Sequence, residues 1–227
     1  MSNLLQITDV VKSFPQPGGG RLNVLDVQRL SIAEGEQVAL VGTSGGGKTT
    51  LLHLIAGLLT PDSGSIKLAG TELTRLSEQG RDRFRASTIG YVFQTFNLLP
   101  AFTALENVKL GMTFGRGGHD AGRAKELLGK VGLADRANYR PSQLSVGQQQ
   151  RVAIARSLAG KPRLLLADEP TANVDPVSAE SVLELIRSSC REENVAMLMV
   201  THDMDVASKF DRIERLENIN RAFAPTA

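Results

Sequence analysis

Short runs of alternating apolar and polar residues dominate the first forty positions of the chain. They cover Leu4 to Val10, Asn23 to Asp26 and Arg29 to Ile32, and the loop from Pro15 to Gly20 separates the first run from the others. Alternation with a period of two is typical of strands that bury one face, and a loop rich in Pro and Gly favours a turn. The pattern therefore predicts an antiparallel β subdomain in the N-terminal part of the chain.

A different pattern begins at Gln37. The continuous apolar run Gln37 to Val41 leads into a glycine-rich loop, and a helical pattern from Thr49 to Leu58 follows. Buried-strand patterns return at Arg163 to Asp168 and Val195 to Val200, with a helical pattern from Pro176 to Glu193 between them. Strand, helix and strand in this order predict parallel pairing with helices on the sheet faces. The predicted fold class is therefore α/β.

The middle of the chain carries helical patterns instead of strand patterns. Between about Leu105 and Leu158 the strand signals disappear, which predicts a helical subdomain at about residues 95–160, inserted in the core. A chain of 227 residues and 24.4 kDa is long enough for one substantial hydrophobic core but short for two independent ones. We therefore expect residues 1–227 to form a single domain.

Composition narrows the possible surroundings of the protein. The 26 basic and 24 acidic residues leave a formal net charge of +2, and the basic residues are scattered, so nucleic-acid binding gets no support. Cys190 is the single cysteine, which favours a reducing compartment. The longest apolar run, near Leu51 to Leu59, is far shorter than the ~18 residues that a membrane span needs. We expect a cytoplasmic chain that does not cross a bilayer unaided.

The glycine-rich loop is the strongest chemical signal. Its residues match the pattern G-x-x-x-x-G-K-[ST], which typically binds the phosphates of a nucleotide between a buried strand and a helix. Glycines let successive backbone N–H groups turn toward phosphate oxygens, Lys48 reaches the β and γ phosphates, and the Thr49 hydroxyl ligates Mg²⁺. The predicted ATP-binding residues of this loop are Gly42, Thr43, Ser44, Gly45, Gly46, Gly47, Lys48, Thr49 and Thr50.

Two adjacent carboxylates end a predicted buried strand. In Leu164-Leu-Leu-Ala-Asp168-Glu169, four apolar residues bury the strand and deliver both acids to its end. Asp168 is suited to the coordination shell of Mg²⁺, and Glu169 to polarising the attacking water. Together with the glycine loop, this pair predicts a P-loop NTPase with a RecA-like core.

A third motif narrows this broad class. In Leu144-Ser-Val-Gly-Gln-Gln-Gln-Arg151, which opens a predicted helix, the chain resembles the ATP-binding cassette (ABC) family, whose LSGGQ signature stands here as LSVGQ. The resemblance implies that Ser145 and Gly147, with Gln148 beside them, bind the γ-phosphate of ATP held by a second copy of the chain. Val146 replaces the first of the two signature glycines and adds bulk there, so its effect on the closed dimer stays open at this point.

The resemblance extends from about Leu4 to Leu216, and it implies further roles. Gln94 matches the glutamine that touches Mg²⁺ and links the nucleotide to the helical subdomain, and Asn173-Val-Asp175 resembles the loop that crosses the dimer interface. His202 matches the histidine that bonds the γ-phosphate. Phe14 stands where the family stacks an aromatic ring on adenine. After Leu216 the chain departs from the family pattern, with Glu217-Asn-Ile-Asn-Arg221 in place of a short turn and final strand.

These features together predict an ATPase that uses ATP and Mg²⁺ and works as a homodimer across two composite ATP sites. A chain with no span of its own must act on a separate transmembrane permease, which would hold it at the cytoplasmic face of the inner or plasma membrane. The apolar cluster Phe96 to Pro100 either docks a helix of that permease or packs within the helical subdomain.

The sequence around this cluster looks most like that of the ATPases of lipoprotein-release and macrolide-export systems. The alternative is a regulatory or mechanical ABC ATPase that acts on a cell-division or cell-envelope complex without moving a solute. ABC ATPases of DNA repair carry a long heptad-bearing insertion, and translation-factor types carry two cassettes, and this chain has neither.

Overall fold

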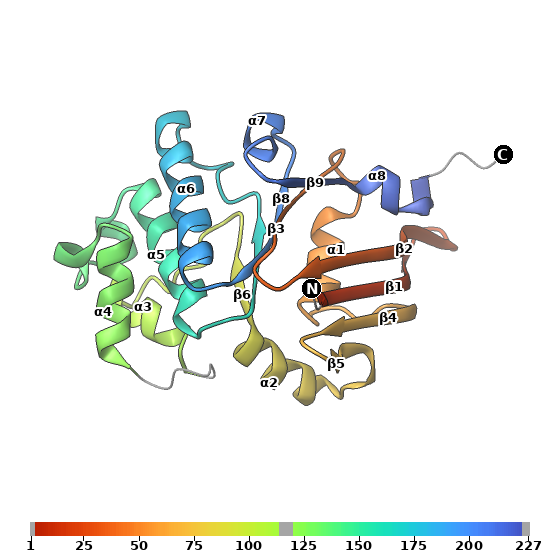
Figure 1. Ribbon diagram of the computed structural model, residues 1–227, viewed down its shortest axis with the longest axis horizontal. Helices are drawn as coiled ribbons and strands as arrows, with labels where there is room; N and C mark the ends of the chain where they lie inside the picture. Colours follow the sequence, from red (N-terminus) through yellow and green to blue (C-terminus); the bar gives the residue numbers. More distant parts are fainter. Residues whose placement is uncertain (1–2, 114–119, 224–227) are drawn as a thin grey trace. The chain divides into compact units, whose positions relative to one another are not determined.

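The computed structural model describes residues 3–113 and 120–223, which divide into two compact units (Figure 1). The first unit comprises the chain up to Asp82 together with the chain from Leu198 onward, and the second comprises Arg83–Met197. The helix α2 (Glu78–Thr88) and the strand β8 (Ala196–Thr201) carry the chain from one unit to the other.

An antiparallel sheet forms one part of the first unit, with the strand order β2-β1-β4-β5. Its strands are β1 (Asn3–Pro15), β2 (Arg21–Ala33), β4 (Ser63–Leu68) and β5 (Thr71–Glu72). The predicted antiparallel β subdomain is therefore confirmed. The sequence predicted two short strands within Arg21–Ala33, whereas the structure has one continuous strand.

The difference arises because the alternation of buried and exposed residues is interrupted in both paired strands, at positions that lie opposite each other. On β2 the neighbours Gln28 and Arg29 are both exposed, and on β1 the neighbours Thr8 and Asp9 are both exposed. Asp9 has a φ of 49°, and Thr8 lies opposite Arg29 while Val10 lies opposite Val27. Because both strands change phase together, the buried residues return to the same face and pairing continues.

The remaining elements of the first unit include a parallel strand pair. All five residues of β3 (Gln37–Val41) are buried, and β3 runs parallel to β9 (Arg212–Arg215), with Val41 opposite Arg215. The other elements are helices, namely α1 (Lys48–Ile55), α7 (Met204–Ala207), α8 (Leu216–Ile219) and the 3₁₀ turns Leu73–Arg75 and Arg221–Phe223. Helix α1 ends before the predicted Leu58, because Gly57 takes a left-handed φ of 67°.

The described residues of the second unit form two parallel strands and four complete helices, besides the end of α2. The strand β6 (Ile89–Val92) pairs with β7 (Leu164–Asp168), and Val92 lies opposite Ala167. The helices are α3 (Ala104–Leu110), α4 (Ala121–Lys130), α5 (Val146–Ala159) and α6 (Pro176–Glu192), with 3₁₀ turns at Ala134–Arg136 and Pro141–Gln143. The predicted α/β class, with parallel strands and a helix-rich middle stretch, is confirmed.

Side-chain caps set where the helices of the second unit begin. Thr103 and Glu106 form a reciprocal capping box for α3, and Asp120 accepts hydrogen bonds from the first turn of α4. Asp175 is the N-cap of α6, and its side chain accepts a hydrogen bond from the Ser178 N–H. Within the described residues, no helix has both the length and the apolar character needed to cross a lipid bilayer.

Candidate functional site

The glycine loop joins the buried strand β3 to α1 in the first unit. Gly45 and Gly47 have φ values of 77° and 91°, a left-handed region that favours glycine. A Cβ on Gly47 would also lie 2.9 Å from Leu25 Cδ2 and 3.1 Å from the Val24 carbonyl oxygen, so a side chain there would force its neighbours to shift. Helix α1 has no side-chain cap at its N-terminus, so its first N–H groups are left for another acceptor. This geometry suits an anion held by backbone N–H groups.

Lys48 lies inside this loop rather than in open solvent. Its side chain is buried, and the ammonium group donates to the carbonyl oxygens of Gly42 and Thr43, each at 2.8 Å. Ser44, Gly45 and Thr49 are exposed at the rim of the loop, and Thr50 is half-buried. A positive charge thus stands behind a ring of backbone groups, as the binding of phosphates requires.

Two acids end the strand β7 in the second unit, where the sequence predicted them. Asp168 is buried, and Glu169 is half-buried with a φ of 45°. A left-handed backbone costs a non-glycine residue about 1–2 kcal/mol, so the neighbouring structure must hold it. Gln150 of α5 contributes to this, because its buried amide donates to the carbonyl of Pro170 at 2.7 Å. Burial and the charge of Asp168 also raise the pKa of the nearby Tyr91 phenol.

The signature residues form the start of α5. Ser145 is the N-cap, its hydroxyl accepts from the Gln148 N–H at 3.3 Å, and the Gln148 side chain accepts from the Ser145 N–H at 3.0 Å. Val146 is 48% exposed, and Gly147 is half-buried. The valine side chain therefore lies at the surface of the unit, next to the exposed Ser145.

Gln94 is exposed just beyond β6. Its backbone carbonyl accepts a hydrogen bond from the Asn173 side chain at 2.8 Å. Asn173 therefore ties the loop after β7 to the loop after β6 within the second unit. The sequence had placed Gln94 and Asn173 in two separate motifs, and only the fold brings these two residues together.

Phe14 and His202 lie in the first unit. Phe14 is half-buried near the end of β1, opposite Leu22, and the Lys12 ammonium lies 5.5 Å from the centroid of its ring. His202 is exposed directly after β8, and the next residue, Asp203, caps α7.

The predicted site residues thus fall into two sets, one in each unit. The first unit holds the adenine-stacking candidate, the glycine loop and the histidine, namely Phe14, residues 42–50 and His202. The second unit holds Gln94, the signature residues Ser145, Gly147 and Gln148, and the acids Asp168 and Glu169.

Sequence reasoning missed a carboxylate at the glycine loop. Glu217 accepts a hydrogen bond from the Thr43 N–H at 2.8 Å. It lies in the stretch after Leu216 where the chain departs from the family pattern. The separation of 174 residues left no local signal for this contact.

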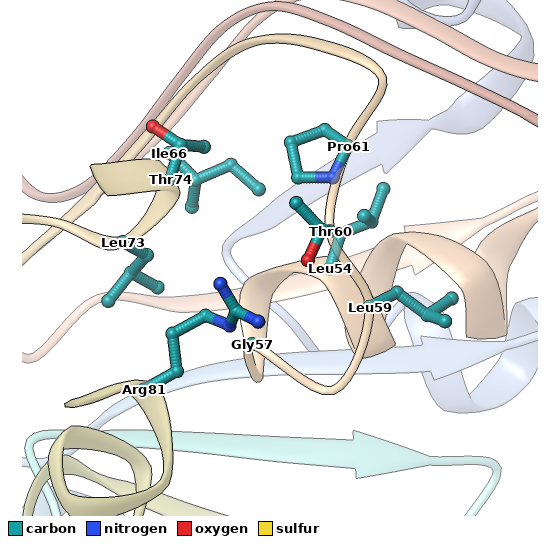
Figure 2. A pocket seen from close by; sticks show the side chains of 9 residues that line it. All are labelled: Leu54, Gly57, Leu59, Thr60, Pro61, Ile66, Leu73, Thr74 and Arg81. Carbon is teal, nitrogen blue, oxygen red and sulfur yellow. The ribbon is translucent and has the colours of Figure 1, made fainter. Parts of the chain in front are cut away.

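The first unit also contains a hollow that the glycine loop does not line. It is lined mainly by apolar residues around the end of α1, and Arg81 reaches toward it (Figure 2). Its lining residues are Leu54, Gly57, Leu59, Thr60, Pro61, Ile66, Leu73, Thr74 and Arg81. None of the predicted site residues contributes to it, so the nucleotide candidate remains the glycine loop.

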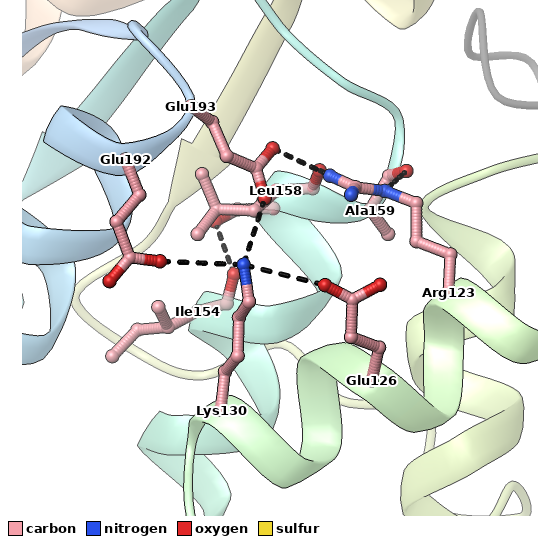
Figure 3. A network of polar contacts seen from close by, with 9 residues as sticks. Arg123, Glu126, Lys130, Ile154, Leu158, Ala159, Glu192 and Glu193 are labelled. Atoms are coloured by element: carbon pink, nitrogen blue, oxygen red, sulfur yellow. Dashed lines mark hydrogen bonds and ion pairs between the residues drawn. The ribbon is translucent and has the colours of Figure 1, made fainter.

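An ion-pair network holds the far end of the signature helix α5 (Figure 3). Arg123 donates to the carbonyls of Leu158 and Ala159 and to the Glu193 carboxylate, the last at 2.6 Å. Lys130 lies within ion-pair distance of Glu193 as well. The helix that presents Ser145 is therefore fixed at its C-terminal end by α4 and by the residue that follows α6.

The apolar segment beyond Gln94 is held by two polar side chains. Arg156 of α5 donates to the carbonyls of Phe96 and Asn97 at 2.8 and 2.6 Å. The amide of Asn107, which is fully buried, accepts from the Leu99 N–H and donates to the carbonyls of Leu99, Phe102 and Thr103. Phe96 and Leu98 are half-buried, whereas Leu99 is 45% exposed.

Comparison with known proteins identifies the family. The sequence profile of the ABC transporter family matches residues 25–172. The chain is 46% identical over 218 residues to a lipoprotein-releasing system ATP-binding protein, LolD, of Nitrobacter hamburgensis, covering 95% of this chain and 93% of that one. It is 45% identical over 221 residues to the LolD of Cereibacter sphaeroides, covering 96% and 98%.

Solved structures agree with the sequence comparison. The ATP-binding cassette MJ0796, in a dimeric post-hydrolysis state bound to ADP and Pi, superposes with a TM-score of 0.84 at 38% identity, covering 93% of each chain. A second dimeric structure of MJ0796, described as a bacterial ABC transporter cassette, matches equally well. The chain therefore belongs to the ABC transporter family, as an ATP-binding and ATP-hydrolysing subunit.

Proposed function

We propose that this subunit couples ATP hydrolysis to a separate transmembrane permease in a system of the lipoprotein-release type. The observation that carries the ATP-binding part of the proposal is the buried Lys48 ammonium inside a loop of glycines at the start of α1, where no side chain caps the helix. The lipoprotein-releasing role named for the relatives at 45–46% identity favours transport over the mechanical alternative. The subunit then works at the cytoplasmic face of the membrane, held there by the permease.

In the first unit, the proposed roles concern binding of ATP. The N–H groups of the glycine loop and of the first turn of α1 receive the phosphates, and Lys48 turns from Gly42 and Thr43 toward the β and γ phosphates. Phe14 stacks on the adenine, with one ring face near Lys12. His202, exposed beyond β8, donates to the γ-phosphate.

In the second unit, the proposed roles concern hydrolysis. Glu169 accepts a proton from the water that attacks the γ-phosphorus, so that the bond to the ADP oxygen breaks and phosphate leaves. Asp168 and Gln94 offer oxygen atoms, the ligands that Mg²⁺ prefers, and in the first unit the Thr49 hydroxyl is proposed as a further ligand. Bound Mg²⁺ supplies charge neutralisation along the phosphates.

We propose a homodimer as the working unit. The similar cassette MJ0796 is dimeric in both solved structures, which supports this proposal. Ser145, Gly147 and Gln148 of one copy then meet the γ-phosphate held by the other copy, and Asn173 to Asp175 lie along the contact. Val146 projects at the surface beside Ser145, where it meets the second copy, so its bulk acts at the dimer contact.

The permease docks, in this proposal, on the apolar segment beyond Gln94. Exposed apolar area is contributed by Leu99, Phe102 and Tyr139, and the Ala104 N–H donates to the Tyr139 carbonyl, so the two stretches adjoin. A short apolar helix on the cytoplasmic side of the permease fits such a patch. Arg156 and Asn107 keep the patch in shape, since the segment Phe96 to Thr103 has no regular backbone pairing of its own.

Substitution of Glu169 by Gln tests the ATPase proposal. The amide keeps the size of the side chain and cannot accept the proton, so turnover is expected to fall at least 100-fold while MgATP still binds and drives dimerisation. Steady-state turnover and light scattering with and without MgATP measure both effects. Glu78→Gln, a change of the same kind on the exposed start of α2, serves as the control. Normal turnover of Glu169→Gln would refute the assigned role.

A matched pair of leucines tests the docking surface. Leu99 is 45% exposed and Leu58, in the first unit, is 46% exposed. Leu99→Ser is expected to lower copurification with the coexpressed permease and to leave the basal ATPase activity of the isolated subunit unchanged, whereas Leu58→Ser should alter neither. Equal copurification of both variants would rule out docking at Leu99.

A further inference from the structure

The stretch that follows β9 packs against the outside of the glycine loop. Leu216 is buried at the start of α8, and a Cβ on Gly42 would lie 3.1 Å from Leu216 Cβ and 3.2 Å from a Glu217 carboxylate oxygen. At Gly46 the corresponding distance to Leu216 Cδ2 is 3.9 Å. The small size of Gly42 therefore lets Leu216 and Glu217 lie directly against the loop.

Both backbone groups of Thr43, its N–H and its carbonyl, form hydrogen bonds. Its N–H donates to Glu217 Oε1 at 2.8 Å. Its carbonyl accepts from the Lys48 ammonium at 2.8 Å and from the Gly46 N–H at 3.1 Å. A carboxylate and an ammonium thus hold the same residue from opposite sides, which limits how the first turn of the loop can move.

The same segment reaches the other end of the loop through β2. The Asn220 amide, which is 2% exposed, accepts from the Asp26 N–H at 2.7 Å and donates to the Val24 carbonyl at 3.0 Å. Val24 is in turn packed against Gly47, where a Cβ would lie 3.1 Å from its carbonyl oxygen. Residues 216–220 therefore support Gly42 directly and Gly47 through one intermediate strand.

The charge of Glu217 argues for a positional role. Its pKa is lowered by its own backbone N–H, then by the Thr43 N–H, with a smaller contribution from the charge of Lys48. The carboxylate is therefore ionised at neutral pH. A negative charge next to a triphosphate site repels the ligand, so the charge alone would weaken binding. What Glu217 supplies is a hydrogen-bond acceptor at a defined place.

We infer that Glu217 is a positioning residue for nucleotide binding, which holds the first turn of the glycine loop in the shape that receives the phosphates before ATP arrives. The inference deepens the proposed nucleotide site and rests on it. Once ATP is bound, its phosphates hold the loop, and Glu217 no longer contributes to the hydrolysis step. The effect therefore falls on affinity rather than on turnover at saturation.

Two substitutions separate the effect of the hydrogen-bond acceptor of Glu217 on ATP binding from the effect of its negative charge. Glu217→Gln keeps an acceptor for the Thr43 N–H and removes the repulsion, whereas Glu217→Ala removes both. We expect Glu217→Ala to raise the Kd for an N-methylanthraniloyl ATP analogue with Mg²⁺ by about 3- to 10-fold, in line with the loss of one charge-assisted hydrogen bond. Glu217→Gln should bind as tightly as the parent or more tightly. The kcat of both variants should stay within about twofold of the parent.

The controls make each outcome decisive. Asn218→Ala, at the exposed neighbouring position, should bind like the parent, and thermal denaturation checks that all variants are folded. If Glu217→Ala binds within twofold of the parent, or if Glu217→Gln is as weak as Glu217→Ala, the positioning role is refuted. Lys48→Ala should lose binding, and parental binding by Lys48→Ala would instead remove the proposed nucleotide site itself.

Discussion

Asn107 offers the sharpest test of how the exposed apolar segment is held. Its side chain is fully buried, and one amide group serves four backbone groups of the segment Leu99 to Thr103. The distances are 2.8 Å from the Leu99 N–H and 3.2, 3.1 and 3.0 Å to the carbonyls of Leu99, Phe102 and Thr103. Replacement by Ala removes every one of these bonds in a single step.

The magnitude follows from these contacts. The two hydrogens of the Asn107 amide are shared among the three carbonyls, so with the bond that the amide accepts the side chain makes about three full hydrogen bonds. At about 1 kcal/mol net for each bond, the sum is about 3 kcal/mol. Leu99 and Phe102 are exposed, so water can reach part of the released backbone and reduce the loss. We expect Asn107→Ala to lower the free energy of unfolding by about 2–3 kcal/mol. Asn107→Asp should lose more, because a carboxylate cannot donate to the three carbonyls and places a buried charge beside them.

Urea denaturation followed by circular dichroism measures the loss of stability, and limited proteolysis reports whether cleavage concentrates between residues 96 and 103. Asn138→Ala, at an exposed position of the same unit, is the matched control and should change the free energy of unfolding by less than about 0.5 kcal/mol. A loss below about 1 kcal/mol for Asn107→Ala, or a more stable Asn107→Asp, would refute the reasoning.

Three further predictions concern packing, charge and pH. Gly90→Ala should destabilise the second unit strongly, because the added Cβ would lie 2.3 Å from the Ser157 carbonyl oxygen, and urea denaturation should show the loss. Arg123→Met should lower the free energy of unfolding by about 2–4 kcal/mol in the same assay, because the largely buried Glu193 carboxylate loses its partner at 2.6 Å. The double variant Arg123→Met with Glu193→Gln removes the unpaired charge and should recover part of that free energy. Burial alone would raise the pKa of Glu72, but hydrogen bonds from neighbouring hydroxyl and N–H groups outweigh burial and lower that pKa. The stability that Glu72 contributes is therefore present above pH ~4.3, the ordinary pKa of Glu, and is lost as the pH falls through the lowered pKa. Glu72→Gln should flatten the acid limb of the stability profile, and an unchanged limb would contradict this assignment.

Much of the candidate site could be predicted from the sequence because its motifs are local. The loop from Gly42 to Thr49 needs a particular order of glycines, Lys and Thr, and that order is visible without any tertiary contact. The acids Asp168 and Glu169 likewise follow directly from the buried strand that precedes them, and Ser145 is placed by its own capping box with Gln148. Periodicity also predicted the strands β3, β7 and β8 and the helices α1 and α6, with ends that differ from the structure by at most a few residues.

Tertiary structure alone decided which distant groups support these motifs. Arg156, Gln150 and Asn107 donate to backbone carbonyls. Every residue has such a carbonyl, so the sequence does not show which ones will accept these bonds. Glu217 meets Thr43 across 174 residues of sequence. The single long strand β2 also required the fold, because its alternation slips where that of its partner β1 slips too. Local order specifies chemistry, whereas the positions of the supporting groups depend on chain segments that only folding brings together.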